Sequence, residues 1–170
     1  MIDIETMGHK SNSVITQIAA VEFDVNTGAT GRAFNAFIDI QSCLDVGLKV
    51  TGGTINFWLN QSKEAQDIYN KATKMNLAVA LQQFNFSLQN DNKNPWGNSA
   101  RFDLGILENA YDACGLKYPF KYYNELDVRT IVFLNPDVKK NMEFIGVKHN
   151  AVDDCKHQIK YITQIIKNNP

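Results

Sequence analysis

The sequence is poor in features that mark secreted, membrane-bound or zinc-binding proteins. It has no apolar run of the length that a transmembrane helix needs, and its start lacks the basic segment and apolar stretch of a secretory signal. Its three cysteines, Cys43, Cys114 and Cys155, lie far apart and form no CxxC spacing. We therefore expect no membrane span, a reducing cytoplasmic compartment, and core packing as the role of each thiol.

The chain also carries little net charge. Its formal net charge of −1 does not by itself indicate a nucleic-acid-binding protein. It does not exclude one either, because bound divalent cations would offset several carboxylates. Internal repeats, low-complexity tracts and interdomain linkers are absent, and 44% of the residues are hydrophobic. Length and composition predict one globular domain over residues 1–170.

Apolar periodicity predicts strands and helices in a mixed order. The expected strands are Met1–Glu5, Ser13–Asp24, Ala33–Ile40, Asn94–Asn98 and Tyr122–Val128. The expected helices are two short ones within residues 52–72, one through Leu77–Leu88, one over Arg101–Cys114 and a long terminal one through Val152–Ile166. Three strands followed by alternating helices and strands predict an α/β fold, with a central mixed sheet of five strands flanked by helices.

The opening stretch MIDIETMGHK places two acids in an otherwise apolar start. If Met1–Glu5 is a strand, side chains alternate, so Asp3 and Glu5 project from the same face. Two like charges on a partly buried face repel each other and are poorly solvated. A bound cation is the simplest compensation. Only Met1 and Ile2 precede Asp3, so either this strand is unusually short or the true start lies upstream.

Two later segments place further ionisable groups near helix starts. Asp103 heads the apolar stripe of the helix over Arg101–Cys114, where it could simply interact with the helix dipole. His149 precedes the terminal helix, for which Asn150 is the expected N-cap, and Asp154 flanks the buried stripe of that helix. Each group alone is more often a cap, a dipole partner or a surface residue than a ligand. Their joint order along the chain favours one common site.

That order resembles the DnaQ-like, DEDDh-type 3′–5′ exonucleases, over nearly the whole chain. DIET resembles the first motif of that family, WGNSARFD the second and HNAVDD the third. TINFWLNQSKEAQ and WGNSARFDLGILENAY are similar, more narrowly, to phage and prophage exodeoxyribonuclease VIII-like and exonuclease A-like domains. The resemblance implies a ribonuclease H-like fold and a phage or bacterial host cell.

The acids suit hard cations with oxygen ligands, so we expect two divalent cations, Mg²⁺ or Mn²⁺. The resemblance makes their ligands Asp3, Glu5, Asp103 and Asp154. It makes His149 the general base, since an unperturbed pKa near 6.5 suits that task. It implies a nucleic-acid partner with a free 3′ end, and it allows a homodimer. The expected substrate contacts are Thr6, Met7, Gly8, Trp58, Asn98 and Phe102.

Several of these residues have a structural explanation as well. Trp58 could stack on a base or pack in the core, and Phe102 has the same two explanations. Lysines near the third motif could attract phosphate, although a solvated face is the commoner explanation: Lys139, Lys140, Lys148 and Lys156. The stretch DVRT at Asp127–Thr130 is interpreted as structural, with Arg129 pairing a nearby acid.

Three functions compete. The first is a metal-dependent 3′–5′ exonuclease that releases nucleoside 5′-monophosphates from single-stranded DNA or RNA. The second is a catalytically silent nucleic-acid-binding module on the same fold, which should have lost at least one of the five site residues. The third is an endonuclease of the same broad fold, which would ignore a blocked 3′ end. The presence of all five residues favours the exonuclease.

Overall fold

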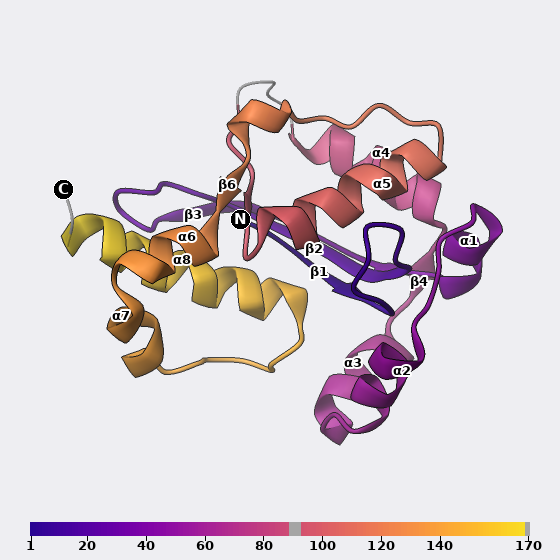
Figure 1. Cartoon of the computed structure of the whole chain (residues 1–170), viewed down its shortest axis with the longest axis horizontal. Helices are drawn as coiled ribbons and strands as arrows, with labels where there is room; N and C mark the ends of the chain where they lie inside the picture. Colours follow the sequence, from indigo (N-terminus) through magenta and orange to yellow (C-terminus); the bar gives the residue numbers. More distant parts are fainter. Residues whose placement is uncertain (89–92, 169–170) are drawn as a thin grey trace.

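A mixed six-stranded sheet organises the molecule, with helices on both of its faces (Figure 1). The computed structural model describes residues 1–88 and 93–168. The strands are β1 (Ile2–Thr6), β2 (Ile15–Phe23), β3 (Thr30–Ile38), β4 (Lys74–Met75), β5 (Trp96–Gly97) and β6 (Leu126–Asp127). Their order is β4-β3-β2-β1-β5-β6. β1, β2 and β3 pair antiparallel, whereas β4, β5 and β6 join in parallel, so the expected α/β fold with a mixed sheet is confirmed.

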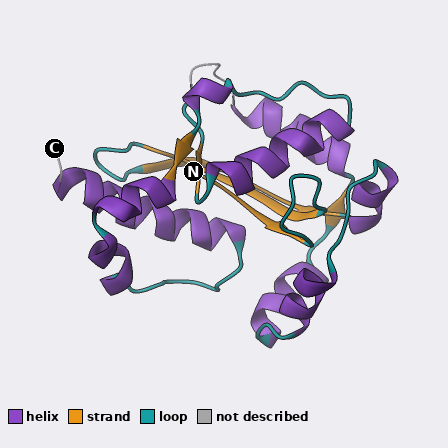
Figure 2. Cartoon of the chain, in the orientation of Figure 1, coloured by secondary structure: helices purple, strands orange, loops and turns teal. Residues whose placement is uncertain are grey.

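Helices fill most of the remaining chain. They are α1 (Ile40–Asp45), α2 (Gly52–Leu59), α3 (Lys63–Lys71), α4 (Leu77–Leu88), α5 (Gly105–Ala113), α6 (Val128–Leu134), α7 (Pro136–Asn141) and α8 (Ala151–Asn168). A π-helical turn, η1 (Ala100–Leu104), precedes α5, and a 3₁₀ turn, η2 (Tyr122–Asn124), precedes β6. Long loops join α5 to η2 and α7 to α8 (Figure 2). The α2–α3 pair lies at one end of the molecule, away from the helices that cover the sheet (Figure 1).

The central strand β1 separates apolar from acidic side chains by its alternation. Ile2 and Ile4 enter the core that α4 and α5 cover on one face of the sheet. Asp3 and Glu5 project from the opposite face, where α8 supplies Asp154. The same alternation that buries two isoleucines therefore aims two carboxyl groups at one helix.

Two apolar cores hold the sheet between its helical layers. The first packs β2 and β3 against α4 and α5, with Phe84 and Tyr111 among its fully buried side chains. The second packs β2 against α8 through Ala19, Val21 and Ile159. Both faces of β2 are thus covered, as its two-sided apolar pattern predicts. The thiols behave as expected: Cys43 and Cys155 are buried, and Cys114 is half-buried against the first core.

The sheet has six strands where the sequence predicts five. The additional strand, Lys74–Met75, pairs in parallel with Phe37 and Ile38 of β3. Two residues carry no alternation, so hydrophobic periodicity has no signal there. The strand predicted over Tyr122–Val128 is also mostly wrong. Only Leu126–Asp127 pairs, because the Asp127 side chain accepts a hydrogen bond from the Thr130 N–H and starts α6.

The predicted helix over Arg101–Cys114 is present but begins differently. Its first turn is the π-helical η1, and α5 follows from Gly105. Gly115, with φ of 65°, lies just past its end, as the sequence predicts. Across residues 1–88 and 93–168, no helix combines the length and apolar character that crossing a membrane requires.

Candidate active site

Three of the expected acids meet between β1 and α8. Single ligand atoms from Asp3, Glu5 and Asp154 all lie within 4.8 Å of one another. Asn150 starts α8 as expected, because its side-chain oxygen accepts a hydrogen bond from the Val152 N–H at 3.2 Å. Asp154 then lies in the first turn of the helix, facing the strand. The cluster joins residues about 150 positions apart, as the motif order predicts.

Asp103 approaches the same strand from η1. Its Oδ1 accepts a hydrogen bond from the Ile4 N–H at 3.4 Å, and its Oδ2 accepts one from the Ser99 N–H at 3.0 Å. A side chain on Gly97 would be crowded, because a Cβ there would lie 3.2 Å from the Asp103 Cβ. Glycine in β5 therefore lets Asp103 lie against β1. Asp103 is outside the three-acid cluster but lines the same cavity.

Gln158 is a site residue that the sequence analysis missed. It lies one helical turn after Asp154 on α8, and its Nε2 donates a hydrogen bond of 2.7 Å to Asp3 Oδ1. The side chain is buried, at 4% exposure, and its Oε1 has no partner among the described residues. A buried amide with one unpaired oxygen beside an acid cluster indicates a missing hydrogen-bond donor. Gln158 follows Asp154 by four residues, and this spacing places both side chains on one face of a helix, which the sequence alone could have indicated.

The four acids are held in an environment that opposes their ionisation. Burial, followed by the charges of Asp103 and Glu5, raises the pKa of Asp3 well above its usual range. Burial and the charge of Asp154 raise the pKa of Glu5 to about 8. Burial also raises the pKa values of Asp103 and Asp154 to about 6. Within the described part of the chain, none of the four forms an ion pair with Lys or Arg.

His149 lies at the entrance to this cluster, on the loop between α7 and α8. Its backbone N–H donates a hydrogen bond to Asp154 Oδ2 at 3.0 Å, and its φ of 64° is left-handed. The imidazole meets Phe57 and Trp58 of α2 edge-on, at centroid distances of 5.2 and 5.9 Å. Burial, together with the positive charge of Lys148, lowers the pKa of His149, which favours the neutral form that accepts a proton.

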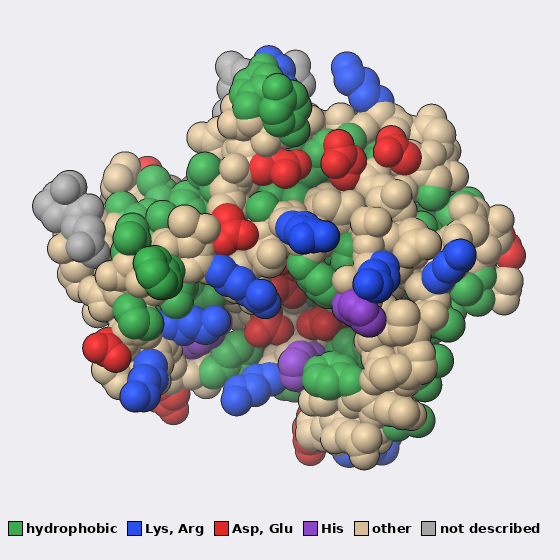
Figure 3. All heavy atoms as spheres, viewed as in Figure 1, with side chains coloured by type: hydrophobic (Ala, Val, Ile, Leu, Met, Phe, Trp, Pro, Cys, Tyr) green, Lys and Arg blue, Asp and Glu red, His purple; other side chains and the backbone are tan. Residues whose placement is uncertain are grey.

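One cavity of about 570 Å³ gathers most of the expected site. Asp3, Glu5, Asp103, His149 and Asp154 all line it, as do Thr6, Gly8, Trp58, Asn98 and Phe102. Acidic side chains gather in the hollow at the centre of the face in Figure 3, with Lys, Arg and His around it. The Asn98 Oδ1 is a further buried atom without a partner among the described residues.

Three expected substrate contacts have structural tasks as well. The Trp58 indole N–H donates a hydrogen bond to the Thr6 carbonyl at 2.8 Å, so this side chain holds α2 to β1. A Cβ at Gly8 would lie 2.5 Å from Ser13 Oγ, so close packing alone requires glycine there. Met7 does not line the acidic cavity. It faces a neighbouring apolar cavity of about 450 Å³ beneath α2 and α3.

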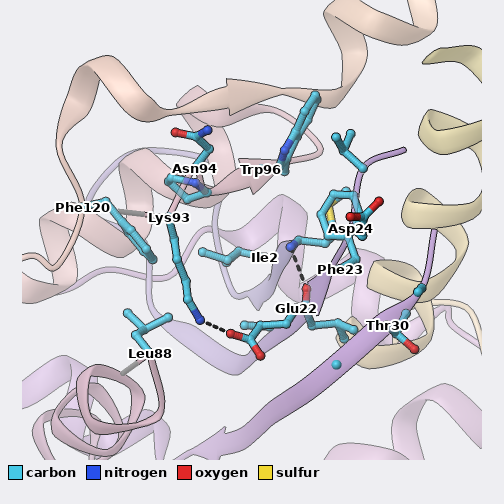
Figure 4. Close-up of a pocket in the computed structure, with 17 residues that line it drawn as sticks. Ile2, Glu22, Phe23, Asp24, Thr30, Leu88, Lys93, Asn94, Trp96 and Phe120 are labelled. Atoms are coloured by element: carbon cyan, nitrogen blue, oxygen red, sulfur yellow. Dashed lines mark hydrogen bonds and ion pairs between the residues drawn. The ribbon is translucent and has the colours of Figure 1, made fainter. Parts of the chain in front are cut away.

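A separate pocket of about 640 Å³ at the other end of β2 provides a contrast (Figure 4). There Glu22 accepts hydrogen bonds from Lys93 and, at 3.1 Å, from Arg32 Nε and Nη2. Those hydrogen bonds lower the pKa of Glu22 to about 2. An acid satisfied by two cations has no need of a metal, whereas the acids around Asp3 lack any such partner.

The chemistry of the donor set fits divalent cations. The four acids supply only oxygen ligands, which hard ions such as Mg²⁺, Mn²⁺ and Ca²⁺ prefer. Their raised pKa values reflect repulsion and burial that a bound cation would relieve. Neither sulfur nor a histidine pair joins the cluster among the described residues, so a zinc site is not indicated.

Comparisons with known proteins agree with this geometry. The family profile described as "3'-5' exoribonuclease Rv2179c-like domain" matches residues 1–166. A protein of Enterobacteria phage T4 named "Exodeoxyribonuclease" is 27% identical over 194 residues, covering 94% of this chain and 85% of its own.

Solved structures share the fold at low sequence identity. The nuclease domain of 3'hExo, a DEDDh family member bound to rAMP, superposes with a TM-score of 0.67 at 14% identity, over 99% of this chain and 90% of that one. A 3'-exonuclease solved for recognition of a histone mRNA stem-loop gives a TM-score of 0.64 at 14% identity, over 99% of this chain and 80% of its own. At such identities the likeness shows the fold alone.

Proposed function

This chain belongs to the 3'-5' exoribonuclease Rv2179c-like domain family and is a 3'-5' exonuclease, and from that premise we propose its reaction. We propose that residues 1–170 form one domain that hydrolyses phosphodiester bonds of single-stranded nucleic acid from the 3′ end and releases nucleoside 5′-monophosphates. One observation carries the proposal. Four acids and a histidine, distant in sequence, line one cavity with no Lys or Arg ion pair to the acids among the described residues.

In this proposal the acids hold two divalent cations, Mg²⁺ or Mn²⁺. Asp3, Glu5 and Asp154 would hold one ion, because their ligand atoms lie within 4.8 Å of one another, and Asp103, which lines the same cavity, would complete the ligand set. When bound, such ions supply neutralisation of charge on the phosphate and a lower pKa for bound water. Gln158 keeps the Asp3 carboxylate in place by donating to its Oδ1.

His149 has the proton-transfer role. Its neutral imidazole accepts a proton from the water that attacks phosphorus, as the bond from phosphorus to the 3′-oxygen of the preceding nucleotide breaks. The departing oxygen then takes a proton from solvent. The lowered pKa of His149 keeps the ring unprotonated near neutral pH. Contacts with Phe57 and Trp58 hold the ring beside the cavity.

The expected substrate contacts remain part of this proposal. Thr6, Gly8, Trp58, Asn98 and Phe102 line the cavity beside the acids, where a terminal nucleotide would lie. The exposed Phe57 ring also lines this cavity and provides a further face for a base. Met7 would act only indirectly, through the packing beneath α2. A homodimer and a cytoplasmic location also stay predictions; light scattering on the purified protein tests the first.

Matched oligonucleotides test the proposed reaction and its substrate together. The family description refers to RNA, and the phage relative's name refers to DNA. We therefore compare 5′-labelled single-stranded RNA and DNA of one sequence, with Mg²⁺ or Mn²⁺ and with EDTA. A ladder that shortens from the 3′ end only with metal supports the proposal. Retention without shortening indicates a silent binding module, and cleavage that ignores a blocked 3′ end indicates an endonuclease.

A further inference from the structure

The turn between β6 and α6, with the sequence DVRT, is fastened to the element that carries Asp103. Asp127 Oδ1 accepts hydrogen bonds from the Thr130 N–H at 2.8 Å and the Thr130 hydroxyl at 3.0 Å. Asp127 Oδ2 accepts a third, at 2.8 Å, from the N–H of Ala100, the first residue of η1. One carboxylate thus caps α6 and ties it to η1.

The same turn fixes the backbone of Arg129. Its N–H donates a hydrogen bond of 3.2 Å to the Asn98 carbonyl, in the segment that leads into η1. Asp127 and Asn98 therefore hold the turn from both sides, and Arg129 projects from a fixed base. A guanidinium on a fixed backbone loses less freedom when it binds an anion than one on a free loop.

Arg129 lines the acidic cavity, and its charge is unpaired. Among the described residues around that cavity, it alone is a lysine or an arginine. The sequence predicts that Arg129 pairs with a nearby acid, and this prediction is wrong. No carboxylate oxygen of the described residues lies within ion-pair distance of its guanidinium. Burial raises the pKa of Asp103, and the charge of Arg129 opposes that rise, so the two side chains are near but separate.

An unpaired guanidinium in the cavity that the four acids line fits an anionic group that enters with the substrate. Arginine presents planar, paired N–H donors that match two oxygens of a phosphate. The cavity walls offer no other Lys or Arg among the described residues, so an incoming phosphate would find one side-chain cation besides bound metal. A role as counter-charge for the acids would instead place the guanidinium within ion-pair distance of one of them.

We propose that Arg129 binds the phosphate that becomes the 5′-phosphate of the released nucleotide, through the non-bridging oxygens. This inference rests on the proposed function. In this role Arg129 would position the substrate and hold the product. The DVRT turn would then serve to fix the backbone of this phosphate-binding residue. The 3′-terminal phosphodiester must lie at the acids to be cleaved, and Arg129 lines the same cavity as those acids.

Titration calorimetry with product-like ligands tests this assignment without turnover. With Mn²⁺ present, adenosine 5′-monophosphate and adenosine are each titrated into the wild type and into Arg129→Ala. Loss of a charge-assisted pair of hydrogen bonds should weaken binding of the monophosphate at least about tenfold, with adenosine unchanged. Arg129→Lys should bind the monophosphate with intermediate affinity. Arg101→Ala is the matched control, because Arg101 is exposed on η1 and does not line the cavity.

Two outcomes would overturn the inference. Either the monophosphate binds Arg129→Ala as tightly as the wild type, or both ligands weaken equally, as expected of a structural role. If Arg129→Ala does not fold by circular dichroism, Arg129→Gln preserves the shape of the side chain and carries the same test. Oligonucleotide cleavage by the wild type is measured separately. A wild type that binds the monophosphate through Arg129 but cleaves nothing would refute the proposed function and keep the phosphate site.

Discussion

At the scale of single residues, the proposed base is positioned mainly through its backbone. His149 donates its N–H to Asp154 Oδ2, its φ is left-handed, and its ring meets Phe57 and Trp58 of α2. No side-chain hydrogen bond of the imidazole is found among the described residues, so neighbouring rings set its orientation. The Asp154 carboxylate, a proposed metal ligand, therefore also fixes the backbone of the residue proposed to take the proton.

Replacing that histidine separates proton transfer from metal binding. We expect His149→Ala to lower kcat by about 100-fold or more, because general-base catalysis is typically worth 10²–10⁴. Binding of Mn²⁺, measured by calorimetry, should change little, since the imidazole is outside the three-acid cluster. His157→Ala is the control, because His157 packs on Phe144 and Tyr161 outside the cavity. An unchanged kcat in His149→Ala would remove His149 from the proton-transfer role.

Gln158 offers a second residue-level prediction. Gln158→Leu keeps the approximate volume but removes the donor to Asp3, and we expect Mn²⁺ affinity to fall about tenfold or more. The measurement is calorimetric titration of Mn²⁺ at pH 7.5. Gln164→Leu on the same helix is the matched control, because Gln164 is exposed and outside the acidic cavity. Equal affinity in the wild type and Gln158→Leu would show that Asp3 needs no help from this amide.

At the scale of elements, α2 and α3 are the least buried helices near the site. Within the described residues of these two helices, only Ala65 is buried, and an apolar cavity of about 450 Å³ lies beneath them. Their main tie to β1 near the site is the Trp58 hydrogen bond to Thr6. Elements with few buried contacts open locally at a lower free-energy cost than the global core.

Hydrogen exchange measures the difference in the free-energy cost of local opening between these helices and the core. We expect amides of α2 and α3 to exchange at least about tenfold faster than those in the middle of α5 and α8, because opening α2 and α3 exposes less apolar surface. Mass spectrometry of peptides covering residues 52–71, 105–113 and 151–168 makes the comparison. Addition of Mn²⁺ and a nucleoside monophosphate should slow exchange in α2, because residues of α2 line the acidic cavity. Equal protection of all four helices would contradict the prediction.

Sequence patterns predicted the elements that follow one period over a long stretch. β1, β3, α4 and α8 lie where alternation or a 3.6-residue repeat places them, and β2 lies where an apolar run on both faces places it. The two-residue β4 depends on pairing with β3, a long-range contact that no local pattern contains. Alternation singled out Asp3 and Glu5, and the order of the later acids linked them to one site, whereas the places of Arg129 and Gln158 in the acidic cavity follow only from the fold that brings distant segments together.

At the scale of the whole molecule, the acid cluster lowers the free energy of unfolding of the metal-free protein. Glu5 has a folded pKa of about 8 against an ordinary 4.5, so the folded protein keeps a proton that the unfolded chain loses as the pH rises. The free-energy cost of Glu5 is therefore small near pH 4.5, grows through pH 5–8, and levels off above pH 8. A cation that binds only the folded state offsets this cost.

The variant Glu5→Gln measures the free-energy cost of Glu5 alone, because an amide does not ionise. In EDTA at pH 8 we expect it to melt at least about 3 °C above the wild type, since one pKa unit is worth about 1.4 kcal/mol and each kcal/mol shifts a domain of this size by about 2–4 °C. At pH 4.5 the two proteins should melt together. With saturating Mn²⁺ at pH 8 the order should reverse, because the wild type binds the ion more tightly. If the difference in melting temperature between Glu5→Gln and the wild type were the same at pH 4.5 and pH 8, the raised pKa of Glu5 would be contradicted.

The placement of the two tryptophans has a practical consequence for studying this enzyme. Trp58 borders the acidic cavity beside His149, whereas Trp96 lies in the separate pocket of Figure 4. Replacing Trp96 with phenylalanine would leave Trp58 as the single indole emitter, located beside His149 at the acidic cavity. Because a protonated imidazole quenches indole emission, the fluorescence of that variant would report the charge of His149 directly, without an attached dye.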